Sequence, residues 1–350
     1  MNNSPLRIEQ LDTVLYNANL NPMGTPDSVI RSISENLSGV TRYPDDYYPA
    51  LKTAIAEYAG CPESELMLGS SLSDMLKKLI FVLKPKKALV FAPSSLEYEN
   101  ALLAYGCEIV HYELDEADNF SFDLAKFAGS VDSSIDMIIV GNPNNPTSQI
   151  IDRDDIETLA EICAQLDAAL VVDEMYIEFT TEHKDITSVP LVSDHKNLYV
   201  LRSTSKFFAV PGLRLAYCIS SDNACYVDVR QYFCKNSITA LTAVAGTAMF
   251  KDEKYIKETV SSVGTERNLI YSAMSPCKNI RLFKPHANFM LARILKQDVN
   301  AKMLAEHCRL KGIIIRDCSD FYGLDEHFIR FCFMKPSQND LLVNTILELL

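Results

Sequence analysis

The sequence predicts an α/β protein, with a large domain built on a mostly parallel sheet flanked by helices and a smaller α+β domain at the C-terminal end. Short apolar runs alternate with helical segments up to about residue 220, as expected for strands that are buried on both faces of a parallel sheet. After about residue 240 the pattern changes to longer helices followed by further strands. A chain of 350 residues is also long enough for two such units.

The large domain is expected to open with two helices. Leu51, Ala54, Ile55 and Tyr58 repeat at helical spacing, and Gly60 follows as a C-cap. A more strongly amphipathic helix is predicted over 72–83, ending before a proline, and two more over 96–105 and 154–166. The predicted strands of the sheet are Ala88–Phe91, Ile109–Tyr112, Met137–Val140, Ala169–Val172, Leu198–Leu201 and Leu215–Ile219.

The small domain is predicted from three later strands, Asn288–Arg293, Ile313–Arg316 and Phe328–Phe333. We therefore divide the chain into an N-terminal segment (1–40) that packs with the small domain, a large domain (41–240) and a small C-terminal domain (241–350).

Composition and charge exclude several functions. With 33 basic against 46 acidic residues and a net charge of −13, the chain lacks the basic stripe that nucleic-acid phosphates need. A few arginines could still bind a small anion. The start, MNNSPLRIEQ, lacks the apolar core of a signal peptide, and no apolar run approaches about 18 residues. The ten cysteines form no C-x-x-C pair and are interpreted as buried thiols. We therefore expect a cytoplasmic protein without membrane contact.

Metal and dinucleotide sites are also not expected. The six histidines include no pair at i, i+4, which argues against zinc. No G-x-G-x-x-G follows the first strand of the sheet, which disfavours a nicotinamide dinucleotide.

Polar residues follow three consecutive predicted strands. Asn142–Thr147 comes after the third, Asp173–Tyr176 after the fourth, and Arg202–Lys206 after the fifth, with Arg214 eight residues beyond the lysine. Ligands of an open parallel sheet bind beyond the carboxyl ends of its strands, so these groups are expected to meet at one edge.

This set of groups fits pyridoxal 5'-phosphate. A lysine can bind the cofactor covalently, and a carboxylate beside the pyridine nitrogen keeps the ring protonated, so that it accepts electrons. An amide and a phenol can hydrogen-bond the ring hydroxyl. Hydroxyls, an arginine and the helix N-terminus behind Gly69-Ser70-Ser71 can bind the phosphate.

The motifs NPNNPT (142–147), VVDEMYIEF (171–179) and STSKFFAVPGLR (203–214) resemble the fold-type I, class I/II aminotransferases that depend on pyridoxal phosphate. Within that family the chain is most similar to the group of histidinol-phosphate aminotransferases and threonine-phosphate decarboxylases. The resemblance begins at ANLNPMG (18–24) and reaches the C-terminal strand.

The resemblance assigns roles to individual residues. It implies Lys206 as the lysine that holds the cofactor, Asp173 as the partner of the ring nitrogen, and Asn145 and Tyr176 as ligands of the ring hydroxyl. The implied phosphate site consists of Ser70, Ser71, Ser203, Ser205 and Arg214. Tyr43 would reach the phosphate from the neighbouring subunit of a homodimer with shared active sites. Arg316 and Arg330 would bind the substrate's carboxylate or phosphate.

Two positions depart from the family pattern. Ser148 stands where NPTG normally ends in glycine, and Ser95 stands where an aromatic residue normally stacks on the cofactor. Tyr98, one helical turn later, could stack instead, although packing in the core is the favoured interpretation.

Amino transfer on a small amino acid or amino phosphate is the expected reaction. The alternative is decarboxylation of a phosphorylated hydroxy-amino acid, because 313–331 is similar to threonine-phosphate decarboxylases. Their usual His-Gly-Gly start is missing, since no histidine precedes His111. A non-catalytic protein that binds the cofactor is a further, weaker alternative.

Overall fold

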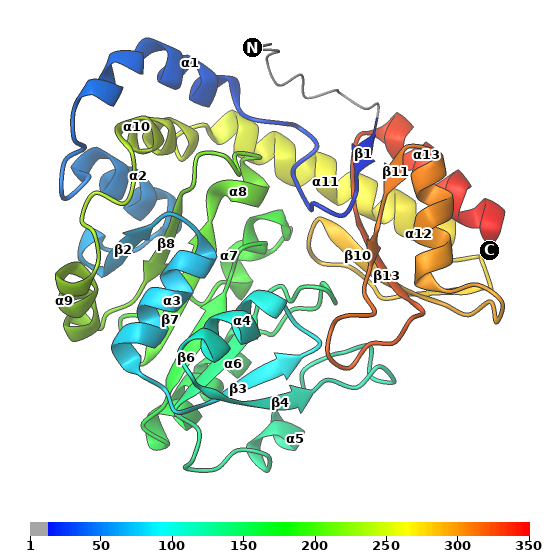
Figure 1. The fold of residues 1–350 in the computed structure, drawn as a ribbon, viewed down its shortest axis with the longest axis horizontal. Helices are drawn as coiled ribbons and strands as arrows, with labels where there is room; N and C mark the ends of the chain where they lie inside the picture. Colours follow the sequence, from blue (N-terminus) through cyan, green and yellow to red (C-terminus); the bar gives the residue numbers. More distant parts are fainter. Residues whose placement is uncertain (1–12) are drawn as a thin grey trace, which may run out of the picture.

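The computed structural model describes residues 13–350, and its largest element is a seven-stranded sheet (Figure 1). The strand order is β2-β8-β7-β6-β5-β3-β4, and β8 alone runs opposite to the others. The strands are β2 Leu66–Gly69, β3 Lys87–Ala92, β4 Glu108–Glu113, β5 Met137–Gly141, β6 Ala169–Asp173, β7 Leu198–Ser203 and β8 Ala216–Ile219. The mostly parallel sheet and all six predicted strands are confirmed, whereas β2 was not predicted.

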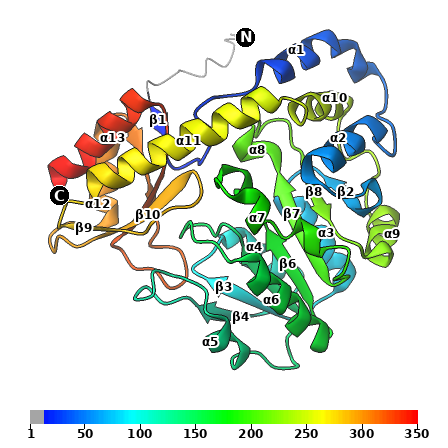
Figure 2. The same ribbon diagram turned by 180° about the vertical axis from the view of Figure 1, so that it is seen from behind.

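Helices cover both faces of this sheet, as the opposite views of Figures 1 and 2 show. One face packs against α3 Leu72–Leu83, α4 Leu96–Ala104 and α9 Asn223–Tyr232. The other packs against α5 Leu124–Ala128 and α6 Arg153–Gln165, together with elements that continue into the small domain. The predicted C-cap of α2 Pro49–Ala59 is confirmed, because Gly60 adopts the left-handed conformation with φ of 75°.

A four-stranded antiparallel sheet forms the core of the C-terminal part, in the order β12-β13-β10-β9. It packs with long helices, and α11 connects it to the large domain (Figures 1 and 2). Its strands are β9 Ile280–Leu282, β10 Phe289–Ile294, β12 Arg316–Asp317 and β13 Phe328–Cys332, and its helices are α11 Glu253–Met274, α12 Ala301–Leu310 and α13 Pro336–Leu349.

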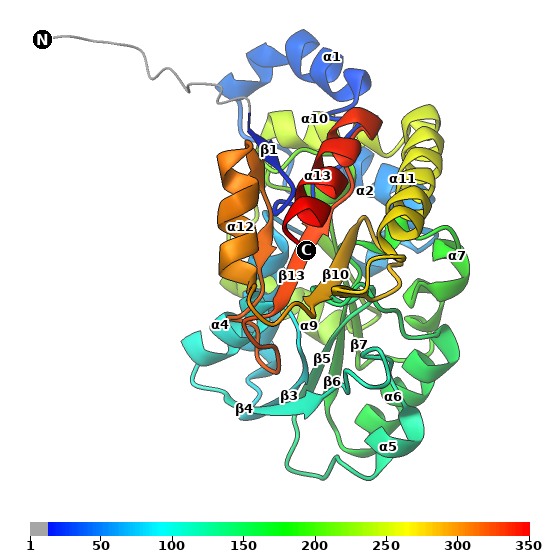
Figure 3. The ribbon, with the colours of Figure 1, turned by 90° about the vertical axis from the view of Figure 1, so that its right-hand side faces the viewer.

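The N-terminal segment contacts both parts of the molecule. Strand β1 Val14–Leu15 pairs with β11 Ile313–Ile314, and the chain then turns toward α1 Asp27–Glu35, which packs on α10 Ala240–Met249 (Figure 3). The pairing of β1 joins the start of this segment to the small domain, and the division of the chain stays a proposal.

The remaining helices are short. They are α7 His183–Ile186, α8 Thr204–Phe207 and the 3₁₀ helices Leu37–Thr41, Glu63–Glu65, Ile177–Phe179 and Val189–Leu191. Across residues 13–350, no helix combines the length and apolarity needed to cross a lipid bilayer.

Candidate active site

A cavity of about 310 Å³ lies beyond the carboxyl ends of β5, β6 and β7. Its walls come from these strand ends, from the starts of α3 and α4, from the N-terminal segment and from β13 of the small domain. The lining includes Asn17, Ala18, Asn19, Ser71, Ser95, Glu97, Asn145, Asp173, Tyr176, Ser203, Ser205, Lys206, Arg214 and Arg330. The edge of the sheet that the sequence indicated therefore carries the cavity.

Lys206 lies in α8, directly after β7. Its Nζ donates a hydrogen bond to the carbonyl oxygen of Ala18 over 2.7 Å. Burial lowers the pKa of this amine, and the positive charge of Arg330 lowers it further. The amine therefore loses its proton more readily than an exposed lysine, as a nucleophile requires.

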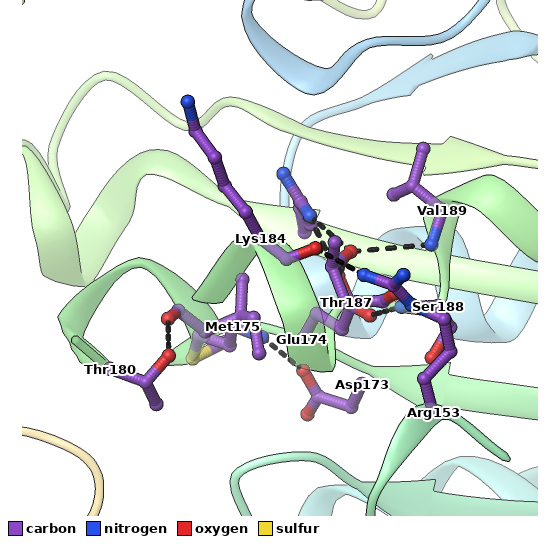
Figure 4. Close-up of polar contacts among 11 residues, drawn as sticks. Arg153, Asp173, Glu174, Met175, Thr180, Lys184, Thr187, Ser188 and Val189 are labelled. Carbon is purple, nitrogen blue, oxygen red and sulfur yellow. Dashed lines mark hydrogen bonds and ion pairs between the residues drawn. The ribbon is translucent and has the colours of Figure 1, made fainter. Parts of the chain in front are cut away.

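Asp173 ends β6 with only 7% of its surface exposed. One carboxylate oxygen accepts the backbone N–H of Met175 over 2.9 Å (Figure 4), and the other accepts the hydroxyl of Tyr98 over 2.6 Å. Burial raises the pKa of Asp173 to about 7, against the effect of these two hydrogen bonds. Such a carboxylate is well suited to a cationic partner inside the cavity.

The neighbouring Glu174 is fully buried and binds Thr187 (Figure 4) and also Arg202. Its Oε2 accepts the Thr187 hydroxyl over 2.8 Å and two guanidinium N–H groups of Arg202 over 2.8 and 3.0 Å. Arg202 belongs to β7, which leads to Lys206, so this ion pair joins the strands that carry the lysine and the aspartate.

Asn145 and Tyr176 lie on the cavity wall beside Asp173. The side-chain oxygen of Asn145 accepts a hydrogen bond from Arg330, and the Tyr176 hydroxyl accepts one from Asn19 over 3.3 Å. The Tyr176 ring packs edge-on against Phe289 of β10. Both polar groups therefore face the interior.

Hydroxyls and an arginine also line the cavity. Ser203 and Ser205 lie 3.0 Å apart between their Oγ atoms, and Ser71 caps α3. Arg214 lines the same cavity and donates to the carbonyl of Pro211. Ser70 lies outside the lining, and its N–H donates to Asp74 over 2.9 Å.

The two candidate substrate arginines differ in position. Arg330 on β13 is buried, lines the cavity and donates to the carbonyl of Asn17 over 2.9 Å. Arg316 is its register partner on β12, but its guanidinium lies outside the lining and binds both carboxylate oxygens of Asp320, over 2.6 and 2.7 Å. The structure thus brings only Arg330 into the cavity.

Tyr43 is 90% exposed and lies outside the cavity of its own chain. Tyr98, considered as a stacking residue, is packed in the core with its hydroxyl on Asp173.

Sequence reasoning missed Asn17, Ala18, Asn19 and Glu97 as cavity residues. A signal was available for Ala18 and Asn19, because both belong to ANLNPMG (18–24), the stretch where the family resemblance begins.

The donor set fits pyridoxal 5'-phosphate. Lys206 offers an amine for covalent attachment, Asp173 a buried carboxylate for the ring nitrogen, and the hydroxyl cluster with Arg214 a site for the phosphate. Within the described residues, Oδ1 of Asn19 and Nε of Arg330 are buried without a hydrogen-bond partner, so polar capacity remains for a ligand. Fold and site together define a pyridoxal-phosphate enzyme.

Comparison with known proteins gives the family. The sequence-family model for aminotransferases of class I and II matches residues 12–346 of this chain. The chain therefore belongs to this family of pyridoxal-phosphate enzymes.

The relatives carry two different names. The chain is 33% identical to a putative threonine-phosphate decarboxylase of Caldanaerobacter subterraneus, over 94% of this chain and 88% of the relative. It is 31% identical to the histidinol-phosphate aminotransferase of Methanothermobacter thermautotrophicus, over 92% of this chain and 85% of the relative. The crystal structure of the histidinol-phosphate aminotransferase from Clostridium acetobutylicum superposes with a TM-score of 0.90 at 28% identity, covering 96% and 98% of the two chains.

Proposed function

We propose that this protein is an aminotransferase that acts on a small amino acid or amino phosphate with an anionic group. The observation that carries this proposal is the meeting of Lys206, Asp173 and Arg330 in one cavity. Pyridoxal phosphate, when bound, supplies an electron sink for the bonds of the substrate's α-carbon.

The residues of the chain divide the remaining work. Arg330 binds an anionic group of the substrate, a carboxylate or a phosphate, because its planar fork suits bidentate binding of either. Lys206, with its lowered pKa, takes the proton from the α-carbon as a general base. Asp173 would place negative charge near the ring nitrogen of the cofactor, and Asn145 and Tyr176 would bind its ring hydroxyl.

Decarboxylation is the second candidate, favoured by the 33% identity to a putative threonine-phosphate decarboxylase. The two reactions differ in the bond that breaks at the α-carbon. In amino transfer that bond carries a proton, and in decarboxylation it carries the carboxylate.

One experiment separates the two candidates. The purified holoenzyme is incubated with histidinol phosphate plus 2-oxoglutarate, or with threonine phosphate, while glutamate and carbon dioxide are measured. Glutamate formation supports amino transfer. Carbon dioxide release from threonine phosphate, with no glutamate formed in the reaction with histidinol phosphate, would replace this proposal with the decarboxylase.

We also propose a cytoplasmic homodimer with shared active sites. The exposure of Tyr43, together with that of Leu37, Val40 and Tyr47, is consistent with a partner subunit covering this face. Every cysteine among the described residues is free, which fits a reducing compartment.

Subunit mixing tests the shared site. Dimers that combine a Tyr43→Phe subunit with a Lys206→Ala subunit should contain one intact site, made of Tyr43 from one chain and Lys206 from the other. The hybrids should then recover about half of the wild-type activity per dimer. Activity no higher than that of the two separately assembled variants would contradict sharing.

Arg316 is proposed to bind a distal phosphate in competition with Asp320. Ion pairs that are exposed to solvent contribute only about 0–1 kcal/mol, so a phosphate dianion can displace this carboxylate. Asp320→Asn should therefore lower KM for phosphorylated substrates about 2- to 5-fold, and Arg316→Lys should raise it. Unphosphorylated analogues are the control, and equal changes for both substrate types would reject the assignment.

A further inference from the structure

The hydroxyl of Tyr98 donates to Oδ2 of Asp173 over 2.6 Å, although Tyr98 itself is not part of the cavity lining. Both side chains are nearly inaccessible, with 2% of Tyr98 and 7% of Asp173 exposed. Hydrogen bonds from neutral donors to charged acceptors are stronger than those between neutral groups, and a buried one is shielded from water. The Tyr98 side chain therefore restricts the position of the carboxylate that we assign to the ring nitrogen.

We propose that Tyr98 is a positioning residue that orients Asp173 and holds it as a carboxylate, and thereby sets the protonation of the cofactor's ring nitrogen. This proposal rests on the role of Asp173 given above. It assigns a function to a residue that does not itself line the cavity.

The packing around the hydroxyl of Tyr98 is adapted to this contact. Gly141 ends β5 and is the register partner of Asp173 on β6. A Cβ atom at Gly141 would lie 3.2 Å from the hydroxyl of Tyr98 and equally close to Asn144, which is tighter than about nine in ten real Cβ contacts. The absence of a side chain at this point leaves the phenol room to reach the carboxylate.

The first turn of α4 separates two tasks. Ser95 lines the cavity where the family normally has an aromatic ring, and Tyr98 lies one turn further along the helix, in the core. Tyr98 is therefore in position to act on Asp173 from behind, without contacting the cofactor.

Electrostatics agree with this geometry. The hydrogen bond from Tyr98 lowers the pKa of Asp173, while burial and the nearby carboxylates of Glu97 and Glu174 raise it. Burial and the charge of Asp173 raise the pKa of the Tyr98 phenol well above its ordinary value, so the phenol remains a donor. The remaining polar partner of the carboxylate is the N–H of Met175.

The chain offers a matched control. Tyr199 is also 2% exposed, and its hydroxyl also donates to a carboxylate, that of Asp222, over 2.6 Å. Neither residue of this second pair lines the cofactor cavity. Tyr199→Phe therefore removes a tyrosine–aspartate hydrogen bond of the same length, to a carboxylate that is less buried, without affecting Asp173.

The test compares Tyr98→Phe with Tyr199→Phe by three measurements: thermal stability, affinity of the cofactor-free protein for pyridoxal phosphate, and the ¹⁵N chemical shift of the labelled ring nitrogen. Both variants should lose similar stability. Only Tyr98→Phe should weaken cofactor affinity, by about 5- to 30-fold, and move the shift toward that of the unprotonated ring. An unchanged shift and affinity within twofold of wild type would overturn the proposal.

A second pair of variants separates this inference from the role of Asp173. In an Asp173→Asn background, Tyr98→Phe should leave the shift unchanged, because the charged acceptor is gone. If Asp173→Asn alone does not move the shift, the role of Asp173 fails. If it does and Tyr98→Phe does not, only the present proposal fails.

A fluorinated tyrosine at position 98 covers the case in which Tyr98→Phe does not fold. Its phenol is a stronger acid and therefore a stronger donor, so cofactor affinity should change in the direction opposite to that expected for phenylalanine. Weaker affinity in this protein would contradict the proposal.

Discussion

Lys206→Ala should abolish measurable turnover and covalent retention of the cofactor. Its Nζ is the amine that lines the cavity beside Asp173, and its pKa is lowered by burial and by Arg330. A positioned general base alone contributes roughly 10²- to 10⁴-fold, and covalent attachment is lost in addition. Activity and the absorption band of the lysine-bound cofactor are the measurements.

The site of attachment can be mapped directly. Borohydride reduction of the wild-type holoenzyme, followed by peptide mapping, should locate a pyridoxyl group on Lys206. Lys257→Ala, which removes an exposed lysine of α11, serves as the control and should keep full activity. In a separate activity assay, a small amine added to Lys206→Ala should restore part of the turnover, because it can replace the lysine in proton transfer. Label on another lysine would refute the assignment.

Local pattern was sufficient for the elements that carry the site. The strands β5, β6 and β7 are continuous apolar runs because both of their faces are buried, and their ends could be read from the polar residues that follow. Asp173 and Lys206 were found in this way. Strand β2, Leu66–Gly69, was missed because its apolar run has only three residues before the glycine.

Contacts between distant segments could not be predicted from local pattern. Tyr98 and Asp173 are 75 residues apart, and Asn17 meets Arg330 across 313 positions. Periodicity identified Tyr98 as a helical residue but contained no information on its hydroxyl. Arg316 is the converse case, because its guanidinium pairs with Asp320, four positions further along the chain, and not with the cavity.

Asp173→Asn should still bind the cofactor but lose most activity. An amide cannot stabilise a protonated pyridine nitrogen, and loss of one charged hydrogen bond in a buried site costs on the order of 2–4 kcal/mol, or roughly 30- to 1000-fold in rate. The comparison is kcat of the two holoenzymes at saturating cofactor. A rate within threefold of wild type would mean that Asp173 is not the partner of the ring nitrogen.

The same substitution should stabilise the cofactor-free protein in a pH-dependent way. Burial raises the pKa of Asp173 from 3.8 to about 7 in the folded chain. Between these values the unfolded chain loses a proton that the native chain keeps, so the free energy of unfolding falls as pH rises, and the full penalty is present above about pH 7. At pH 8, Asp173→Asn should therefore be more stable than wild type by on the order of 2–4 kcal/mol in urea unfolding, and the gain should shrink toward pH 5.

With cofactor bound, the positive ring nitrogen compensates the carboxylate, and the gain should disappear. A gain of equal size at both pH values, or a gain that persists in the holoenzyme, would contradict this prediction. Asp173 would then not be a buried carboxylate that destabilises the cofactor-free protein and is compensated by a cationic ring.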